Sequence, residues 1–419
     1  METNVVMVKL WGMPVGYLSW DKKSEVAFFE YEPEFLERDL DIAPLTMSIN
    51  SPRSRKQIPW PGDKDKLYMG LPPMIADSLP DKWGHSLYKA WLRDNHISAK
   101  NVSPVDHLSF IGSRGMGALE YEPAQKLGED SVFSVEVEHL YEFAKQVLNN
   151  REATVLNAEN SILWQDLIKI SSSPGGKRPK AIVAVNRTTG EVISGQGNIP
   201  AGFDHFILKY DDNSSYPFAR LEYVYYQMAL DAGINMMPSE LRSYGNITHF
   251  LTRRFDRFSN DRIHTQTFAA MAPGGASYED LFSVIRRLKL PYEDSRQQYL
   301  RMVFNVLARN VDDHSKNFSF CMTPDGTWRL SPAYDLTYAV DLSAPAFVNR
   351  HSITINGKNE DITRKDLEAV AQRNDIQDHK SLVEMVSQAV TKFMVYTSEL
   401  QIDQQLIDRL ETDLVRVGF

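Results

Sequence analysis

The stretch Asn310-Val311-Asp312-Asp313-His314-Ser315-Lys316-Asn317, followed downstream by Tyr334-Asp335, decides how this sequence is interpreted. It reads Asp-x-x-x-x-Asn and then, after a short polar and aromatic stretch, a second Asp. Phosphoryl transfer needs a carboxylate that receives or orients the proton of the acceptor hydroxyl, and ligands for the cations that neutralise the phosphates. The pattern therefore predicts a phosphoryl-transfer site, in the order base, first metal ligand, second metal ligand.

Asp312 is the predicted base, because Asp312 and not Asp313 leaves the four-residue gap before Asn317. Asn317 and Asp335 are the predicted metal ligands. A plain polar turn is the competing interpretation, because Asp and Asn readily bond to their own backbone. Zinc is not expected, since no further His or Cys stands at ligand spacing. Magnesium, which takes few protein ligands and shares phosphate oxygens, fits the pattern better.

Three neighbours of this set join the nucleotide-binding candidates. Lys316 is expected to face the γ-phosphate of a bound nucleotide. His314 is expected to brace the loop by hydrogen bonds, a structural part that histidine plays more often here than a catalytic one. Tyr334 directly precedes the second metal ligand.

An upstream lysine and glutamate form the next candidate pair. Lys209 ends an apolar run, Phe206-Ile207-Leu208, from which a lysine reaches α- and β-phosphates. Glu222 follows on an expected helix and would hold that lysine, as a strand lysine and a helix glutamate do in protein kinases. Two solvated surface charges are an equally good interpretation of the same residues.

A basic glycine loop lies further upstream, from Ser173 to Lys180. Adjacent glycines let backbone N–H groups approach phosphate oxygens and form an anion nest. The loop is neither a Walker A sequence nor G-x-G-x-x-G, so on its own a solvated basic turn is the better interpretation. Its position just before a strand favours a phosphate loop, whose candidate residues are Gly175, Gly176, Lys177, Arg178, Pro179 and Lys180.

The segment Arg253-Arg254-Phe255 follows the strand expected over 248–255. A kinase hinge at this point offers backbone N–H and C=O groups to adenine, and Phe255 would cover the base. An ordinary charged strand end is a strong competitor.

Composition and charge limit the class of protein. The 419 residues carry 46 Lys+Arg against 55 Asp+Glu, a net charge of −9. A free-standing duplex DNA binder usually needs an excess of basic residues, so DNA is expected only through a basic patch or a basic partner. One cysteine, Cys321, fits a reducing compartment. With no signal peptide and no long apolar run visible, we expect a cytoplasmic location.

The order of expected elements gives the fold class. Short strand-like runs, among them 5–11, 16–20, 26–31, 45–49 and 118–121, fill the first part with helices over 78–94 and 105–111. Helices over 135–148 and 162–170 precede strands over 181–186 and 206–210, and from 277 onward the pattern is mostly helical. We predict an α+β protein: an N-terminal β-rich domain (1–125), connecting helices and a kinase N-lobe (126–260), and a helical kinase C-lobe (261–419).

Motifs along nearly the whole chain resemble the HipA-type kinases, the toxin halves of HipBA toxin–antitoxin modules. The opening Val8-Lys9-Leu10-Trp11 with Pro14-Val15-Gly16-Tyr17-Leu18 resembles the start of that family's N-terminal domain. The other matching segments are Asp77-Ser78-Leu79-Pro80-Asp81, Phe110-Ile111-Gly112 with Gly115-Met116-Gly117-Ala118-Leu119, the Asp312–Asn317 loop, and Ser331-Pro332-Ala333-Tyr334-Asp335.

The resemblance implies a Ser/Thr protein kinase that uses ATP and Mg2+, with Asp312 as base and Asn317 and Asp335 on the metal. It implies a protein substrate, with a translation component as an extrapolation, and a small helix-turn-helix antitoxin of the HipB type that carries the contact with DNA. Ser173 falls where the family carries an autophosphorylated serine that ejects the loop, although Ser171 and Ser172 are adjacent alternatives. Arg253 departs from a Glu that is common in the hinge.

Two other functions compete with this interpretation. A small-molecule phosphotransferase would have much the same catalytic loop, but the N-terminal part resembles the toxin family. An inactive module that only holds an antitoxin would be expected to have lost Lys209, Asp312 or Asp335, and all three are present.

Overall fold

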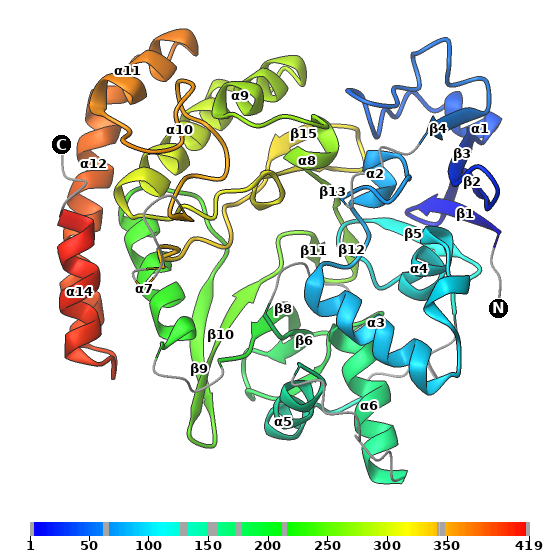
Figure 1. The fold of residues 1–419 in the computed structure, drawn as a ribbon, viewed down its shortest axis with the longest axis horizontal. Coiled ribbons are helices and arrows are strands. Elements are labelled where there is room, and N and C mark those ends of the chain that lie inside the picture. Colours follow the sequence, from blue (N-terminus) through cyan, green and yellow to red (C-terminus); the bar gives the residue numbers. More distant parts are fainter. Residues whose placement is uncertain are drawn as a thin grey trace.

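The computed structural model describes residues 4–61, 67–125, 133–148, 158–171, 178–211, 216–341, 343 and 348–415. Figure 1 shows an N-terminal sheet unit beside a second sheet, and a group of helices that closes the other side of the second sheet. In the described ranges, no helix is both long and apolar enough to span a bilayer. The predicted α+β class, with its β-rich start and helical end, is confirmed.

The N-terminal unit is built on an antiparallel five-stranded sheet. Its strand order is β4 (Ile58–Pro61), β3 (Val26–Tyr31), β2 (Met13–Asp21), β1 (Val5–Leu10) and β5 (Leu119–Glu122). Alternate residues of β1 are fully buried, as expected for a sheet with one face on a core. The unit also holds α1 (Pro33–Leu36), α2 (Pro73–Ala76), α3 (Lys82–Asp94), a 3-10 turn at Ala99–Asn101 and α4 (Pro104–Ile111).

A second antiparallel sheet has the order β7 (Val192–Ser194), β6 (Lys180–Asn186), β8 (Phe203–Lys209), β10 (Ile247–Arg253) and β9 (Ser239–Tyr244). Its β6 residues pack in one apolar cluster with α5 (Val137–Leu148) and α6 (Ala158–Ser171). On β10, Leu251 joins that cluster while the adjacent Phe250 packs against α7 (Phe218–Asp231). Successive strand residues point to opposite faces, so α7 lies on the face away from α5 and α6.

The C-terminal half surrounds α10 (Tyr292–Leu307), which is buried over most of its length. Around it lie α8 (Phe268–Met271), α9 (Tyr278–Arg287), α11 (Arg364–Arg373), α12 (His379–Thr391), α13 (Phe393–Ser398) and α14 (Gln404–Val415). A small sheet of β13 (His264–Thr267), β14 (Ser319–Met322) and β15 (Trp328–Leu330) carries the loop with the Asp-x-x-x-x-Asn motif, which includes the 3-10 turn Ser315–Asn317. The short hairpin β11 (Arg257–Phe258) and β12 (Asp261–Arg262) precedes β13.

One expected strand is wrong. Residues 45–49 form turns, because Met47 N donates to Ala43 O at 2.9 Å and Ile49 N donates to the Asp41 carboxylate at 3.4 Å. A side chain that bonds to nearby backbone competes in this way with strand pairing. The helix expected from Ser78 begins four residues later, at Lys82, after Pro80.

Candidate active site

A pocket lies where the N-terminal unit, the second sheet and the C-terminal half meet. Eleven of its lining residues belong to the predicted site: Lys180, Lys209, Glu222, Arg253, Arg254, Phe255, His314, Lys316, Asn317, Tyr334 and Asp335. Residues that are 155 positions apart, Lys180 and Asp335, therefore share one cavity. The pocket is also lined by Asp77, Ser78, Leu79 and Asp81 of the N-terminal unit.

Lys209 is the centre of the charged end of the pocket. Its Nζ contacts the Glu222 carboxylate on α7 and the Asp335 carboxylate on the segment after β15. Burial opposes the ammonium charge, but the attraction of Asp335 and Glu222 outweighs it and raises the pKa of Lys209. The structure thus brings the strand lysine and the helix glutamate into contact, whereas the sequence alone is equally consistent with two surface charges.

Asp335 sits in an unusual backbone conformation. Its φ is +54°, in the left-handed region that non-glycine residues rarely adopt. Residues with such backbone angles are more frequent at functional sites. Burial opposes its charge, but Lys209 and Lys180 hold the pKa of the Asp335 carboxyl well below its usual range. Lys180 pairs with Lys209 in the register of β6 and β8, so two lysines stand side by side on the sheet. Asp335 is therefore an ionised carboxylate beside two lysines, while Glu222 supplies a second carboxylate to Lys209.

The two adjacent aspartates of the loop have different surroundings. Asp313 is buried and accepts hydrogen bonds from Tyr278 Oη at 2.8 Å and Ser352 N at 2.7 Å, and it contacts His351 Nδ1 at 2.8 Å. Asp312 is exposed, and its carbonyl oxygen accepts from Asn317 Nδ2 at 2.8 Å. Only Asp312 offers a carboxylate to a molecule from solvent, which agrees with its choice as the base by spacing.

Lys316 and Tyr334 are tied into the same corner. Lys316 Nζ donates to Asp81 Oδ1 at 2.7 Å, and the Lys316 carbonyl accepts from Tyr334 Oη at 2.8 Å. The Tyr334 ring stacks on Phe255, with centroids 5.6 Å apart and planes 26° apart. Two aromatic rings thus lie together on the wall of the pocket, between the expected hinge and the expected metal ligands.

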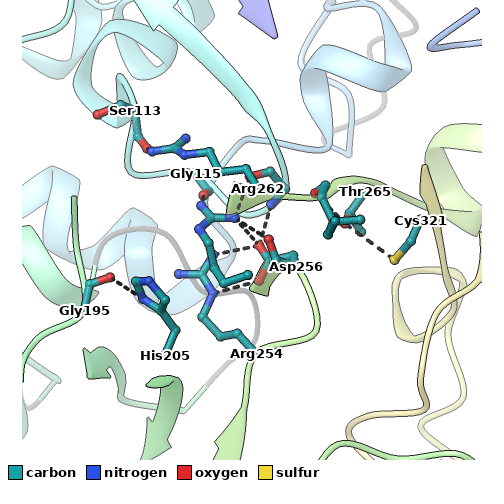
Figure 2. A network of polar contacts seen from close by, with 12 residues as sticks. Ser113, Gly115, Gly195, His205, Arg254, Asp256, Arg262, Thr265 and Cys321 are labelled. Atoms are coloured by element: carbon teal, nitrogen blue, oxygen red, sulfur yellow. Dashed lines mark hydrogen bonds and ion pairs between the residues drawn. The ribbon is translucent and has the colours of Figure 1, made fainter. Parts of the chain in front are cut away.

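Both arginines of the expected hinge contact acidic side chains of the protein, and Figure 2 shows Arg254 against Asp256. The guanidinium of Arg254 is buried and bonds to both oxygens of Asp256, and Arg253 pairs with Asp204 at 2.8 Å. Their backbone N–H groups donate to His205 O and Pro238 O, each at 2.9 Å. An adenine contact at this place would therefore have to use their carbonyl oxygens or Phe255.

The network around Asp256 joins this segment to the N-terminal unit (Figure 2). Asp256 accepts from Gly117 N at 2.7 Å, while Arg257 bonds to Asp256 and also to Gly115 O and Gly117 O. Two arginines hold the pKa of Asp256 well below its usual range although burial opposes this. The turn of the N-terminal unit that holds Gly115 and Gly117 is thus bonded to the two residues that follow the expected hinge in the chain, Asp256 and Arg257.

Part of the predicted phosphate loop lies outside the described residues: Ser173, Gly175, Gly176 and Lys177, with the alternative Ser172. The guanidinium of Arg178 lies over the Phe218 ring, and Pro179 O accepts from Tyr210 N at 3.1 Å. The third candidate serine, Ser171, is fully buried as the last residue of α6. A kinase acts on a reachable hydroxyl, so this burial disfavours Ser171.

Sequence reasoning missed Asp77 and Asp81 as residues of the pocket. Asp77 accepts from Thr267 N and Thr267 Oγ1, both at 2.7 Å. The hydrogen bonds of Thr267 to Asp77 and of Lys316 to Asp81 join residues that are 190 and 235 positions apart, so no local sequence pattern predicts them. The resemblance of residues 77–81 to a motif of the HipA-type kinases is the one sequence signal at this place.

Comparisons with known proteins agree with this architecture. Residues 6–122 match the model of the HipA N-terminal domain, and residues 172–395 match that of the HipA-like C-terminal domain. A putative kinase, Y4mE of Sinorhizobium fredii, is 25% identical over 209 residues, 43% of this chain and 48% of that protein. The serine/threonine-protein kinase toxin HipA of Shewanella oneidensis is 26% identical over 148 residues, 29% of this chain and 34% of that protein.

The matched stretches thus span about half and about a third of these relatives. A solved structure covers far more of the chain: the Shewanella oneidensis toxin–antitoxin complex of HipA, HipB and operator DNA. It aligns with 99% of this chain and 96% of the other at a TM-score of 0.68 and 17% identity, which shows a common fold. Because the HipA-like C-terminal model alone covers more than half of the residues, the chain belongs to the HipA family.

Proposed function

We propose that this protein is a Ser/Thr protein kinase of the HipA toxin type, which transfers the γ-phosphoryl group of ATP to a hydroxyl of a protein substrate. The observation that carries the proposal is the contact of Lys209 Nζ with both Glu222 and Asp335 in one pocket. The exposed Asp312 is not among the residues that line this pocket, but its carbonyl oxygen accepts a hydrogen bond from the side chain of Asn317, which does line it. A lysine held between a helix glutamate and a metal-binding aspartate is the arrangement that protein kinases require.

Each residue has a distinct part in the proposed reaction. Lys209, with Lys180 beside it, binds the phosphates, and the stacked rings of Phe255 and Tyr334 form the apolar wall for the base. Asp312 accepts the proton as the substrate oxygen forms its bond to the γ-phosphorus and the bond to ADP breaks.

The residues present fit magnesium. Asn317 and Asp335 supply one amide and one carboxylate, the oxygen ligands that Mg2+ takes alongside phosphate oxygens. Within the described ranges, no three His, Cys, Asp or Glu side chains gather as a metal site, so the nucleotide would supply the other ligands. When bound, the ion neutralises the charge that develops on the phosphoryl oxygens.

The proposal is tested by phosphate transfer from labelled ATP. We expect incorporation into a protein acceptor, or into the chain itself, that requires Mg2+ and falls at least 100-fold in Asp312→Asn, a loss typical of removing a catalytic base. Asp361→Asn, the same change at another exposed aspartate of the C-terminal half, serves as the matched control and should retain activity. Full transfer by Asp312→Asn would remove Asp312 from its role.

Ser173 is the proposed site of self-modification. A phosphate there would lie beside Lys177 and Arg178 in the sequence and could form charge-assisted bonds with them. Mass spectrometry of the chain after incubation with ATP should locate phosphate at Ser173. Phosphate found at Ser172 instead would move the site by one residue, and transfer to a small molecule without any protein acceptor would favour a small-molecule phosphotransferase.

A HipB-like helix-turn-helix antitoxin is the proposed partner, with DNA bound mainly through it. The net charge of −9 supports an indirect rather than a direct contact with DNA. The structural neighbour of the same fold was solved together with HipB and operator DNA. Co-purification with the product of an adjacent helix-turn-helix gene tests this partner.

We also propose the division of the chain at residues 125 and 260. The kinase N-lobe would end, and the helical C-lobe begin, at residue 260.

A further inference from the structure

Residues 77–83 of the N-terminal unit are attached to both sides of the pocket. Asp77 binds Thr267 at the end of β13, with two hydrogen bonds of 2.7 Å. Six residues later, Trp83 Nε1 donates to Lys180 O on β6 at 3.1 Å, and the Trp83 side chain is fully buried. The segment thus runs from the C-terminal half to the second sheet, and these anchors fix what lies between them.

Asp81 lies between the anchors and has an uncommon arrangement. It is the N-cap of α3, with φ −72° and ψ −169°, yet its side chain makes no cap hydrogen bond. An N-cap aspartate ordinarily accepts from a backbone N–H in the first turn of its own helix. Here the carboxylate instead accepts from Lys316 Nζ at 2.7 Å, across 235 residues of sequence. The hydrogen bond of this carboxylate thus goes to the loop that carries Asn317 and not to the first turn of α3.

Lys316 needs such a partner to have a defined position. A lysine has four flexible side-chain bonds and a compact charge, so it loses much freedom when it is held in one geometry. The residue directly precedes the metal-ligand candidate Asn317, and both side chains line the pocket. An ammonium has three donors, and the bond to Asp81 uses one of them while it directs the remaining ones.

We propose that Asp81 is a positioning residue which holds Lys316 toward the terminal phosphate of the bound nucleotide, so that the N-terminal unit completes the active site. The inference rests on the proposed kinase function and deepens it. The competing interpretation is an ordinary surface ion pair. Both side chains are only about one-fifth to one-quarter exposed, at 20% and 26%, and the segment that carries Asp81 is anchored at both ends, which sets this pair apart from a mobile surface pair.

The test compares nucleotides that differ by the terminal phosphate. In the full chain with Mg2+, we expect Asp81→Asn to weaken binding of the non-hydrolysable ATP analogue AMP-PNP about tenfold, the effect of one charge-assisted hydrogen bond, and to leave ADP binding unchanged within about twofold. The turnover number should fall by a similar factor. Asp81→Glu should recover part of the loss, and Asp39→Asn, an exposed aspartate of the same unit, should behave as wild type.

A double-variant cycle adds a readout that a structural role would not move. If Asp81 acts through Lys316, then Asp81→Asn combined with Lys316→Gln should lose no more than Lys316→Gln alone. Equal losses for ADP and AMP-PNP, or additive losses in the double variant, would overturn the proposal. Wild-type kinetics in Asp81→Asn would overturn it while the kinase function stands. A wild-type chain that transfers no phosphate from ATP would overturn the proposed function, and this inference with it.

Discussion

Replacing Asp256 by Asn should destabilise the protein strongly, although we propose no role for Asp256 in the reaction. The Asp256 side chain is fully buried and accepts from Arg254 Nε at 2.8 Å, Arg254 Nη2 at 2.7 Å, Arg257 Nη1 at 2.9 Å and Gly117 N at 2.7 Å. Asn has a similar shape but one acceptor oxygen and no charge. Two buried guanidinium groups would then lose their counter-charge, which costs about 3–5 kcal/mol.

That loss is large beside the total free energy of unfolding of a folded domain, about 5–15 kcal/mol. A nearby pair supplies the matched control: Asp204 binds Arg253 at 2.8 Å, but these side chains are 28% and 32% exposed. Asp204→Asn should therefore cost no more than about 1 kcal/mol. Urea unfolding followed by tryptophan fluorescence measures both variants. An Asp256→Asn midpoint no lower than that of Asp204→Asn would refute the argument.

Three further predictions concern the candidate site and the core. Asp313→Asn should lower the free energy of unfolding by about 1–3 kcal/mol because it disturbs a buried hydrogen-bond network, whereas Asp312→Asn, at an exposed residue, should change it by less than about 0.5 kcal/mol. Thermal melts should therefore separate the two variants, and equal melting temperatures would contradict a structural role for Asp313 alone. Lys209→Met should reduce phosphate transfer at least 100-fold by removing the buried cation, and unchanged transfer in a labelled-ATP assay would exclude this role. Acid should weaken the fold well above pH 4, because burial lowers the pKa of four histidines to about 3 or about 4: His107, His205, His249 and His264. Below about pH 6.5 the unfolded chain binds protons at these histidines while the folded chain does not, so each histidine lowers the free energy of unfolding by about 2 kcal/mol at pH 5. A urea midpoint that stays constant from pH 7.5 to 5 would refute this prediction.

The choice between Asp312 and Asp313 illustrates what a sequence can provide. The spacing to Asn317 is a property of the chain itself, and the exposure of Asp312 beside the buried Asp313 agrees with it. The α+β order of elements was predictable for the same reason, since apolar periodicity is local. The pairing of Lys209 with Glu222 was ambiguous, because single charged residues on a strand and a helix do not reveal whether they face solvent or each other.

Other features depended on contacts that sequence does not encode locally. The strand β13 has His264 and Gln266 on its buried side, so it lacks the apolar alternation by which strands are found. The hinge was assigned from its order in the chain, but the backbone N–H groups of Arg253 and Arg254 are used by carbonyls of two other segments. These partners become neighbours only after the sheet has formed.

The N-terminal unit contacts the rest of the chain in two ways. Toward the second sheet the contact is apolar, since Trp83, Leu87 and Phe110 pack in the same buried cluster as residues of β6 and β8. Toward the C-terminal half the apolar contact is smaller. The apolar cluster of the N-terminal unit takes in one fully buried residue of the C-terminal half, Met322. Hydrogen bonds to the C-terminal half accompany it: Tyr68 Oη to Ala269 O at 2.8 Å, Thr267 to Asp77, and Lys316 to Asp81. Apolar packing is non-directional, whereas a hydrogen bond weakens steeply when its angle changes.

The hydrogen bonds to the C-terminal half determine the orientation of the N-terminal unit there. Thr267, held by Asp77, is also the N-cap of α8. The next residue, Phe268, donates its N–H to Phe318 O at 2.7 Å, directly after the loop that carries Asp312 and Asn317. The N-terminal unit is therefore connected to this loop in two ways: through Thr267 and the contact of Phe268 with Phe318, and through the hydrogen bond of Lys316 to Asp81. A rotation of the unit against the C-terminal half would disturb both contacts, and the buried cluster of Trp83, Leu87 and Phe110 with the second sheet opposes such a rotation. The packing of the N-terminal unit on the second sheet therefore stabilises the position of Lys316.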